Sequence, residues 1–301
     1  MDLTLKFEEQ FSQLSERVKS VDLHPTQPWI LVALYSGTVC IWNYQSQAIQ
    51  KSFKVTDSPV RSAKFIASKH WIVTGADDKF VRVFNYDTME LIKEIEAHQD
   101  YIRSVSVHPT LPYVVSASDD KLIKIWDWDK DWACTQTFEG HSHYAMQAVF
   151  NPKYTNSLAS ASLDGTIKIW ELGSPASVAT LEGHSKGVNC VDFLTCGDNT
   201  YLLSGSDDFT VKIWDYQTQD CVKTLEGHTN NVTAVSAHQE FAIIVSTSED
   251  GSIRIWDAHT FGNFSTLNYN LERVWTVGCV KGSQKIALGC DKGTIMVEVS
   301  S

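Results

Sequence analysis

The chain repeats one short motif, first as Ile41-Trp42-Asn43-Tyr44 and then as Val83-Phe84-Asn85-Tyr86, Ile125-Trp126-Asp127-Trp128, Ile169-Trp170-Glu171, Ile213-Trp214-Asp215-Tyr216 and Ile255-Trp256-Asp257. A degenerate seventh copy is Met296-Val297-Glu298. The aromatic-equivalent positions, 42, 84, 126, 170, 214, 256 and 297, are 41 to 44 residues apart. A period of this length predicts an array of structural repeats, and seven copies predict seven units.

The sequence between the copies reads as short strands. Residues 201–214 alternate between β-branched and polar side chains around a Gly/Asp turn, which predicts a hairpin. Units end in Gly-His or Ala-His at His98, His141, His184 and His228. With its Trp-Asp and Gly-His signals, the chain resembles the WD-repeat β-propeller family over essentially its whole length. This resemblance implies an all-β, seven-bladed propeller, because a single four-stranded blade cannot bury both of its faces.

The two ends of the chain are expected to close the ring. The seventh unit lacks an outer strand, since the chain ends soon after Val297, whereas Leu3-Thr4-Leu5-Lys6-Phe7 alternates as a strand before the first unit. We therefore predict that the N-terminal strand completes the last blade and removes an exposed sheet edge. Residues 1–301 would then form a single domain.

Composition excludes several classes of function. The net charge is −11, from 25 basic and 36 acidic residues, which argues against nucleic acid as the main partner. No apolar run approaches the 18 residues of a membrane span, and no secretory signal is visible at the start. The seven cysteines form no Cys-x-x-Cys pair, which favours reduced thiols in the cytosol.

The repeated histidines and aspartates are predicted to be structural. In the WD-repeat family, such residues form a buried hydrogen-bonded network with the tryptophan of the same blade. The resemblance assigns this role to His98, Asp120 and Trp126, to His184, Asp208 and Trp214, and to His228, Asp250 and Trp256. The sequence has no zinc-ligand spacing, no phosphate-binding glycine loop and no Gly-x-Ser-x-Gly, so we expect no enzyme, no metal and no cofactor.

Two repeat positions depart from what a scaffold needs. The residue before the turn aspartate is acidic in five of seven units; the series is Tyr35, Asp77, Asp119, Leu163, Asp207, Glu249 and Asp291. The second residue of each predicted innermost strand is Lys19, Arg61, Arg103, Met146, Asn189, Thr233 or Trp275, and Arg17 and Arg273 precede two of these strands. Basic residues thus gather at blades seven, one and two, and acidic residues continue through blades three, five and six. A merely solvated acidic surface is one explanation; the other is a site for a peptide C-terminus with nearby lysines.

Several stretches narrow the resemblance to the coatomer β′ family of the COPI vesicle coat. They include Glu16-Arg17-Val18-Lys19, Pro59-Val60-Arg61-Ser62, Asp100-Tyr101-Ile102-Arg103 and Leu271-Glu272-Arg273-Val274-Trp275. Phe84 favours β′ over the sister α subunit, where Trp would be expected. The resemblance implies a receptor for C-terminal Lys-Lys-x-x or Lys-x-Lys-x-x signals on cargo tails that return from the Golgi to the endoplasmic reticulum. It also implies a longer subunit, peripheral on Golgi membranes and coated vesicles, which contacts the α and ε subunits through regions absent here.

The family's site residues transfer individually onto this sequence. By resemblance, Arg17, Lys19 and Arg61 hold the terminal carboxylate, Asp100 and Asp119 bind the principal lysine, Asp207 binds the other lysine, and Tyr35 contacts the peptide. The main alternative is a coat scaffold or adaptor that binds other proteins without recognising cargo. A methyl-lysine reader is disfavoured, because such readers need an aromatic cage and the lysine-facing positions here are carboxylates.

Overall fold

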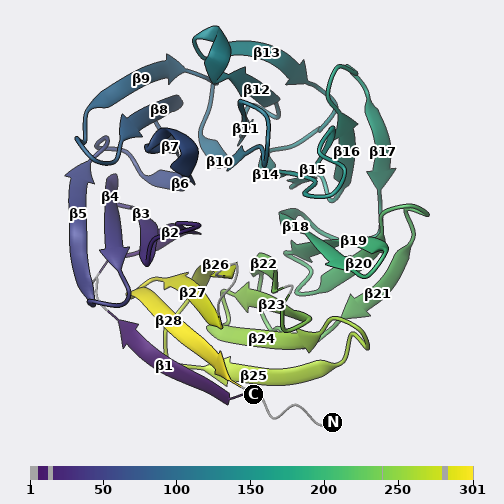
Figure 1. Cartoon of the computed structure of the whole chain (residues 1–301). Helices are drawn as coiled ribbons and strands as arrows, with labels where there is room; N and C mark the ends of the chain where they lie inside the picture. Colours follow the sequence, from purple (N-terminus) through teal and green to yellow (C-terminus); the bar gives the residue numbers. More distant parts are fainter. Residues whose placement is uncertain (1–5, 13–15, 239, 280–283, 301) are drawn as a thin grey trace.

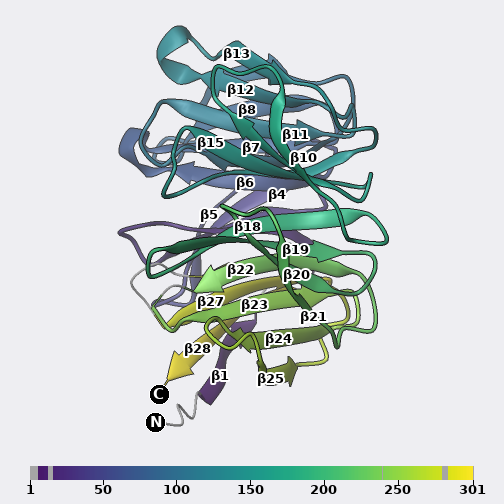
Figure 2. The same cartoon turned by 90° about the vertical axis from the view of Figure 1, so that its right-hand side faces the viewer.

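The computed structural model describes residues 6–12, 16–238, 240–279 and 284–300. These residues form seven four-stranded antiparallel sheets arranged around a central axis (Figure 1). Figure 2 shows the same ring from the side. The prediction of an all-β, seven-bladed propeller is confirmed.

Each blade runs from an inner strand at the axis to an outer strand at the rim. Blade one comprises β2 (Val18–Leu23), β3 (Trp29–Leu34), β4 (Thr38–Asn43) and β5 (Ala48–Lys54); blade two β6 (Val60–Ile66), β7 (Trp71–Ala76), β8 (Phe80–Asn85) and β9 (Leu91–Glu96); blade three β10 (Ile102–Val107), β11 (Tyr113–Ser118), β12 (Ile123–Asp127) and β13 (Ala133–Phe138); blade four β14 (Ala145–Phe150), β15 (Ser157–Ser162), β16 (Ile167–Glu171) and β17 (Ser177–Leu181). Blade five comprises β18 (Val188–Cys196), β19 (Asn199–Ser206), β20 (Val211–Asp215) and β21 (Cys221–Leu225), and blade six β22 (Val232–His238), β23 (Ile243–Ser248), β24 (Ser252–Asp257) and β25 (Asn263–Asn268). Two short 3-10 turns, η1 (Ala67–Lys69) and η2 (Trp128–Lys130), are the only helical elements among the described residues.

Blade seven contains both ends of the chain. Its strands are β26 (Val274–Cys279), β27 (Lys285–Cys290), β28 (Gly293–Ser300) and, outermost, β1 (Lys6–Ser12). β1 pairs antiparallel with β28, from Lys6 opposite Ser300 to Ser12 opposite Ile295. The predicted ring closure is therefore confirmed, although residues 3–5 of the predicted strand lie outside the described part of the chain.

The apolar core lies between the blades. Seven apolar clusters each combine residues of two neighbouring blades. The repeat tryptophan packs against the preceding blade, as when Trp214 of blade five contacts the cluster that contains Ala159 and Ile169 of blade four. Because each blade buries its faces only against its neighbours, the ring must be complete for all clusters to form.

Hydrogen bonds also join successive inner strands. The amide of Ala63 donates to Ser20 Oγ at 3.3 Å, that of Val105 to Ser62 Oγ at 3.1 Å, and that of Ala148 to a third serine, Ser104. Further round the ring, the Val191 amide donates to Gln147 Oε1 at 2.8 Å, and the Ala237 amide donates to Asp192 Oδ2 at 3.1 Å. These bonds fix the positions of the inner strands along the channel axis. They therefore also fix where the first residues of each inner strand lie along that axis.

Candidate functional site at the channel mouth

Every inner strand carries a β-bulge at its second residue. In blade one, Val18 pairs with Leu34 and Ser20 with Ala33, so Lys19 is the unpaired extra residue. The extra residues of the seven blades are Lys19, Arg61, Arg103, Met146, Asn189, Thr233 and Trp275. A bulge re-aims the side chain that it frees from the ladder, and here it directs the series identified in the sequence into the mouth of the central channel.

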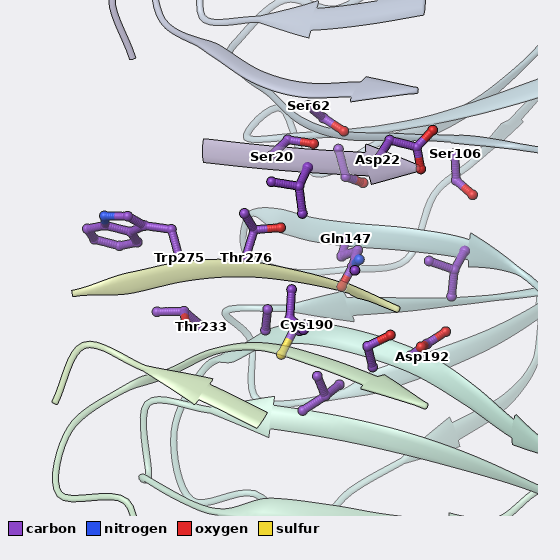
Figure 3. A pocket seen from close by; sticks show the side chains of 18 of the residues that line it. Ser20, Asp22, Ser62, Ser106, Gln147, Cys190, Asp192, Thr233, Trp275 and Thr276 are labelled. Carbon is purple, nitrogen blue, oxygen red and sulfur yellow. The ribbon is translucent and has the colours of Figure 1, made fainter. Parts of the chain in front are cut away.

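The turn residue of each blade is bound beside the start of its inner strand. The amide of Asp77 donates to the carbonyl of Pro59, that of Asp119 to Tyr101 and that of Asp207 to Gly187, so each turn lies beside the residue that precedes the inner strand. All seven bulge residues line a channel with a volume of about 890 Å³, together with four of the turn residues, Tyr35, Leu163, Asp207 and Glu249. Figure 3 shows Trp275 toward one end of this channel and Asp22, Ser106 and Asp192 toward the other.

Most turn carboxylates are bound by the bulge residue of their own blade. Arg61 donates to Asp77 through Nε and Nη2, at 2.5 and 2.7 Å. Arg103 binds Asp119 in the same bidentate manner, at 2.6 and 2.5 Å. These pairs were not predicted from the sequence. The available signal was the constant offset of 16 residues that separates Arg61 from Asp77, Arg103 from Asp119 and Trp275 from Asp291.

Blades five and seven use neutral donors in the same geometry. Asn189 Nδ2 donates to Asp207 Oδ1 at 2.7 Å. Trp275 Nε1 donates to Asp291 Oδ1 at 2.8 Å. Asp291 also accepts hydrogen bonds from Arg17 and Arg273. Burial alone would raise the pKa of the Asp291 carboxyl, but the hydrogen bonds from Trp275, Arg273 and Arg17 lower it.

Lys19 differs from the other cations of the mouth. Among the described residues, no carboxylate lies within ion-pair distance of its ammonium, which stands 3.5 Å from the centroid of the Trp275 ring. Burial, followed by the charges of Arg61, Arg17 and Arg103, lowers the pKa of Lys19 to about 7. The positive charges around Lys19 therefore exceed the negative ones, and an anion placed there would relieve the repulsion.

The structure brings together the three residues assigned to a carboxylate. The guanidinium carbons of Arg17 and Arg61 lie 5.0 and 5.9 Å from the centroid of the Tyr35 ring, and Arg17 lies 5.6 Å from that of Trp275. Tyr35 is 43% exposed, and both arginines contact its ring. Arg17, Lys19 and Arg61 thus surround one corner of the mouth, between blades seven and two.

The residues assigned to lysines are distributed over two blades. Asp119 is 5% exposed and already holds Arg103, so any ammonium there would share an occupied carboxylate. Asp100 lies in the loop before β10; its carboxylate accepts the Tyr101 amide, and its carbonyl accepts Ser118 Oγ. Asp207 belongs to blade five, two blades further round the ring.

The histidine–aspartate residues form buried networks within their blades. In blade three, Trp126 Nε1 donates to Ser116 Oγ at 2.8 Å, and His98 joins that hydroxyl to Asp120, with contacts of 2.7 and 2.8 Å. Burial lowers the pKa of His98 despite its aspartate. Burial alone would raise the pKa of Asp120, but hydrogen bonds from His98 and from the Gln99 and Leu122 amides lower it to about 2.

The same geometry recurs in three further blades. His184 and His228 contact Asp208 and Asp250 at 2.8 and 3.1 Å, and Trp214 and Trp256 donate to the serines of their blades. The fourth set, in blade four, was not predicted from the sequence; it consists of His141, Asp164, Ser160 and Trp170. Their spacing matches that of the other three sets and could have revealed them.

The described residues carry no side-chain group of the kind that holds a metal ion and no disulfide. No group of three or more His, Cys, Asp or Glu side chains in the described part of the chain could hold a metal ion. All seven cysteines are free. No helix in the described ranges has the length and apolar character needed to cross a membrane.

Comparison with known proteins defines the class of the protein and then its family. The model of the WD domain, G-beta repeat, matches residues 7–43, 48–85, 89–127, 132–171, 175–215 and 219–257, so the chain is a WD-repeat propeller. It is 69% identical to coatomer subunit beta'-2 of Oryza sativa subsp. japonica, 65% identical to coatomer subunit beta'-1 of Arabidopsis thaliana and 61% identical to coatomer subunit beta' of Homo sapiens, in each case over 299 residues or 99% of the chain. The chain belongs to the coatomer β′ family. It spans about a third of the length of these curated relatives, which are coatomer subunits.

Proposed function

We propose that this propeller is the cargo-binding domain of a COPI coat subunit. It would bind C-terminal Lys-Lys-x-x and Lys-x-Lys-x-x signals on the cytosolic tails of membrane proteins that return from the Golgi to the endoplasmic reticulum. Residues 1–301 would act as one domain at the N-terminal end of a longer subunit. Membership of the coatomer β′ family supports the coat role.

The observation that carries the proposal is the environment of Lys19. Its ammonium lacks a carboxylate partner among the described residues, lies against Trp275 and is surrounded by Arg17, Arg61 and Arg103. A terminal carboxylate would supply the missing negative charge and accept charge-assisted hydrogen bonds from several donors. A lysine three residues from the end would then lie about 7–10 Å away along an extended chain, in the direction of the carboxylates of blade three.

A calorimetric titration tests the carboxylate site directly. A Lys-x-Lys-x-x peptide with a free C-terminus should bind at least about tenfold more tightly than the same peptide amidated, because the amide loses the charge. Lys19→Met should reduce this difference. Unlike a change at Arg61, it leaves no carboxylate without its partner.

Lys292→Met provides the matched control. It removes the same charge from an exposed residue of blade seven that binds the Asn270 carbonyl, and it should leave peptide affinity nearly unchanged. Equal affinities for the free and amidated peptides would remove the carboxylate site. The propeller would then be a coat scaffold without direct cargo recognition.

A further inference from the structure

Blade four departs from the chemistry of the channel mouth. In blades two and three the bulge residue and the turn residue form an ion pair, and in blades five and seven they form a hydrogen bond. In blade four these two positions hold Met146 and Leu163. Blade four is thus the one blade of the described ring in which both positions are aliphatic.

The two side chains are held at the mouth and not in the core. The amide of Leu163 donates to the carbonyl of Tyr144 at 3.0 Å, as the turn aspartates of other blades do at the equivalent position. Both side chains line the channel and are partly exposed. Neither belongs to the apolar clusters that join blade four to blades three and five.

The neighbouring residues give this aliphatic pair a defined shape. A Cβ atom on Gly187 would lie 2.7 Å from Leu163 Cδ2, so the bare backbone of blade five supports the leucine from one side. Tyr144, whose carbonyl accepts the Leu163 amide, has its ring centroid 5.9 Å from the guanidinium of Arg103. The aliphatic pair therefore has the glycine backbone of blade five beside it, and Tyr144 links it to Arg103 of blade three.

The order of the blades places this pair between the two proposed lysine sites. β14 packs between β10 and β18, so the mouth residues of blade four lie between Asp119 in blade three and Asp207 in blade five. On the proposed function, one lysine lies at Asp119 and the second at Asp207. In a Lys-x-Lys-x-x tail, a single residue separates these lysines, and it is the fourth from the C-terminus.

We propose that Met146 and Leu163 form an apolar subsite for the residue between the two lysines of a Lys-x-Lys-x-x tail. This inference rests on the proposed function and extends it, because it makes a non-basic residue of the signal part of the recognition. Cargo tails with an aliphatic side chain at this position are then preferred over tails with serine or aspartate. In Lys-Lys-x-x tails a lysine occupies this position, and its methylene stem takes the same contact.

Peptide titrations with the whole propeller test the subsite. Three peptides differ only at the fourth residue from the end, which is Leu, Ala or Ser. The wild-type protein should bind the Leu peptide about five- to tenfold more tightly than the Ser peptide, since a buried leucine removes several methyl and methylene groups from water. Met146→Gln, which keeps the length of the side chain, should reduce this preference to about twofold or less, whereas Met146→Leu should keep it.

The outcomes separate this inference from the function on which it rests. If no peptide of the series binds the wild-type protein, the proposed function itself is wrong. If all three bind with equal affinity, dilysine recognition stands and the apolar subsite is refuted. Leu163→Asn provides a second variant if Met146→Gln does not fold, and an unchanged preference in either folded variant would also refute the subsite.

Discussion

The Asp120 carboxylate should stabilise the folded state by an amount that can be derived from its contacts. Oδ2 accepts hydrogen bonds from His98 Nδ1 and the Gln99 amide, and Oδ1 accepts one from the Leu122 amide. In Asp120→Asn, the side-chain oxygen can serve only one side of this set. If it stays with Leu122, the new amide group faces the Gln99 N–H donor directly. A change of tautomer can adapt His98 but cannot remove this conflict.

The lowered pKa gives the magnitude. A shift from 3.8 to about 2 corresponds to about 2 kcal/mol of folding free energy at neutral pH. For a domain of 301 residues, that loss should lower the melting temperature by about 3 °C. Because the folded pKa lies below the unfolded one, the stabilisation is present above about pH 4 and is lost as the pH falls through the folded value.

Thermal unfolding followed by circular dichroism measures both effects. The melting temperatures of the wild type and Asp120→Asn should differ most at neutral pH and converge as the pH falls from about 4 toward 2. Asp131→Asn is the control: it makes the same chemical change in the same blade, at a side chain that is 88% exposed. A difference that stays constant down to about pH 3, or an equal loss in the control, would refute the derivation.

Two further predictions concern the mouth. The pKa of Lys19 is lowered to about 7 in the free protein, and a bound carboxylate should raise the pKa of Lys19 again, so peptide binding should take up a proton. Peptide affinity measured by calorimetry should therefore fall by up to about tenfold per pH unit above 7. Lys19→Met should abolish this pH dependence. In chemical denaturation, Gly37→Ala should destabilise the propeller more than Gly173→Ala. Both glycines have φ near +86°. A Cβ at Gly37 would lie 2.0 Å from the Thr56 carbonyl oxygen, whereas a Cβ at Gly173 would meet nothing within 4 Å. Equal losses in the two glycine variants would show that the turn conformation, and not the close approach, sets the cost.

The fold was predictable because its signal is repeated. Seven copies of one spacing indicate the number of blades, and the turn together with the tryptophan, present in five of the seven copies, indicates the faces of the strands. The position of the closing strand was less certain from sequence: alternation indicated 3–7, whereas the described strand covers Lys6–Ser12. Its register depends on hydrogen bonds to β28, a strand almost 300 residues away, and local alternation carries no information about that pairing.

The site was predictable as a set of positions but not as a set of contacts. The bulge leaves no mark in the sequence, because its extra residue has a different type in almost every blade. The constant offset of 16 residues relates Arg103 to Asp119 and Arg61 to Asp77, but only the bulge shows why these side chains reach each other. The two charge series therefore looked separate in sequence, with a basic half and an acidic half, whereas in the folded protein much of each series is neutralised within single blades.

The pairing of β1 with β28 determines how the ring responds to tension. Lys6, the first residue of β1, lies opposite Ser300, the last residue of β28, so a force applied through Lys6 and Ser300 acts at the same end of this two-stranded ladder. A force that pulls Lys6 and Ser300 apart therefore breaks the hydrogen bonds between β1 and β28 one pair of residues at a time. This is the unzipping geometry, in which the hydrogen bonds are not sheared together. Breaking the β1–β28 pairing separates the outer strand of blade seven, while the other six blades keep all their strands. When the two ends of the chain are pulled apart, the propeller should therefore first lengthen by a small step at low force, and only then unfold blade by blade.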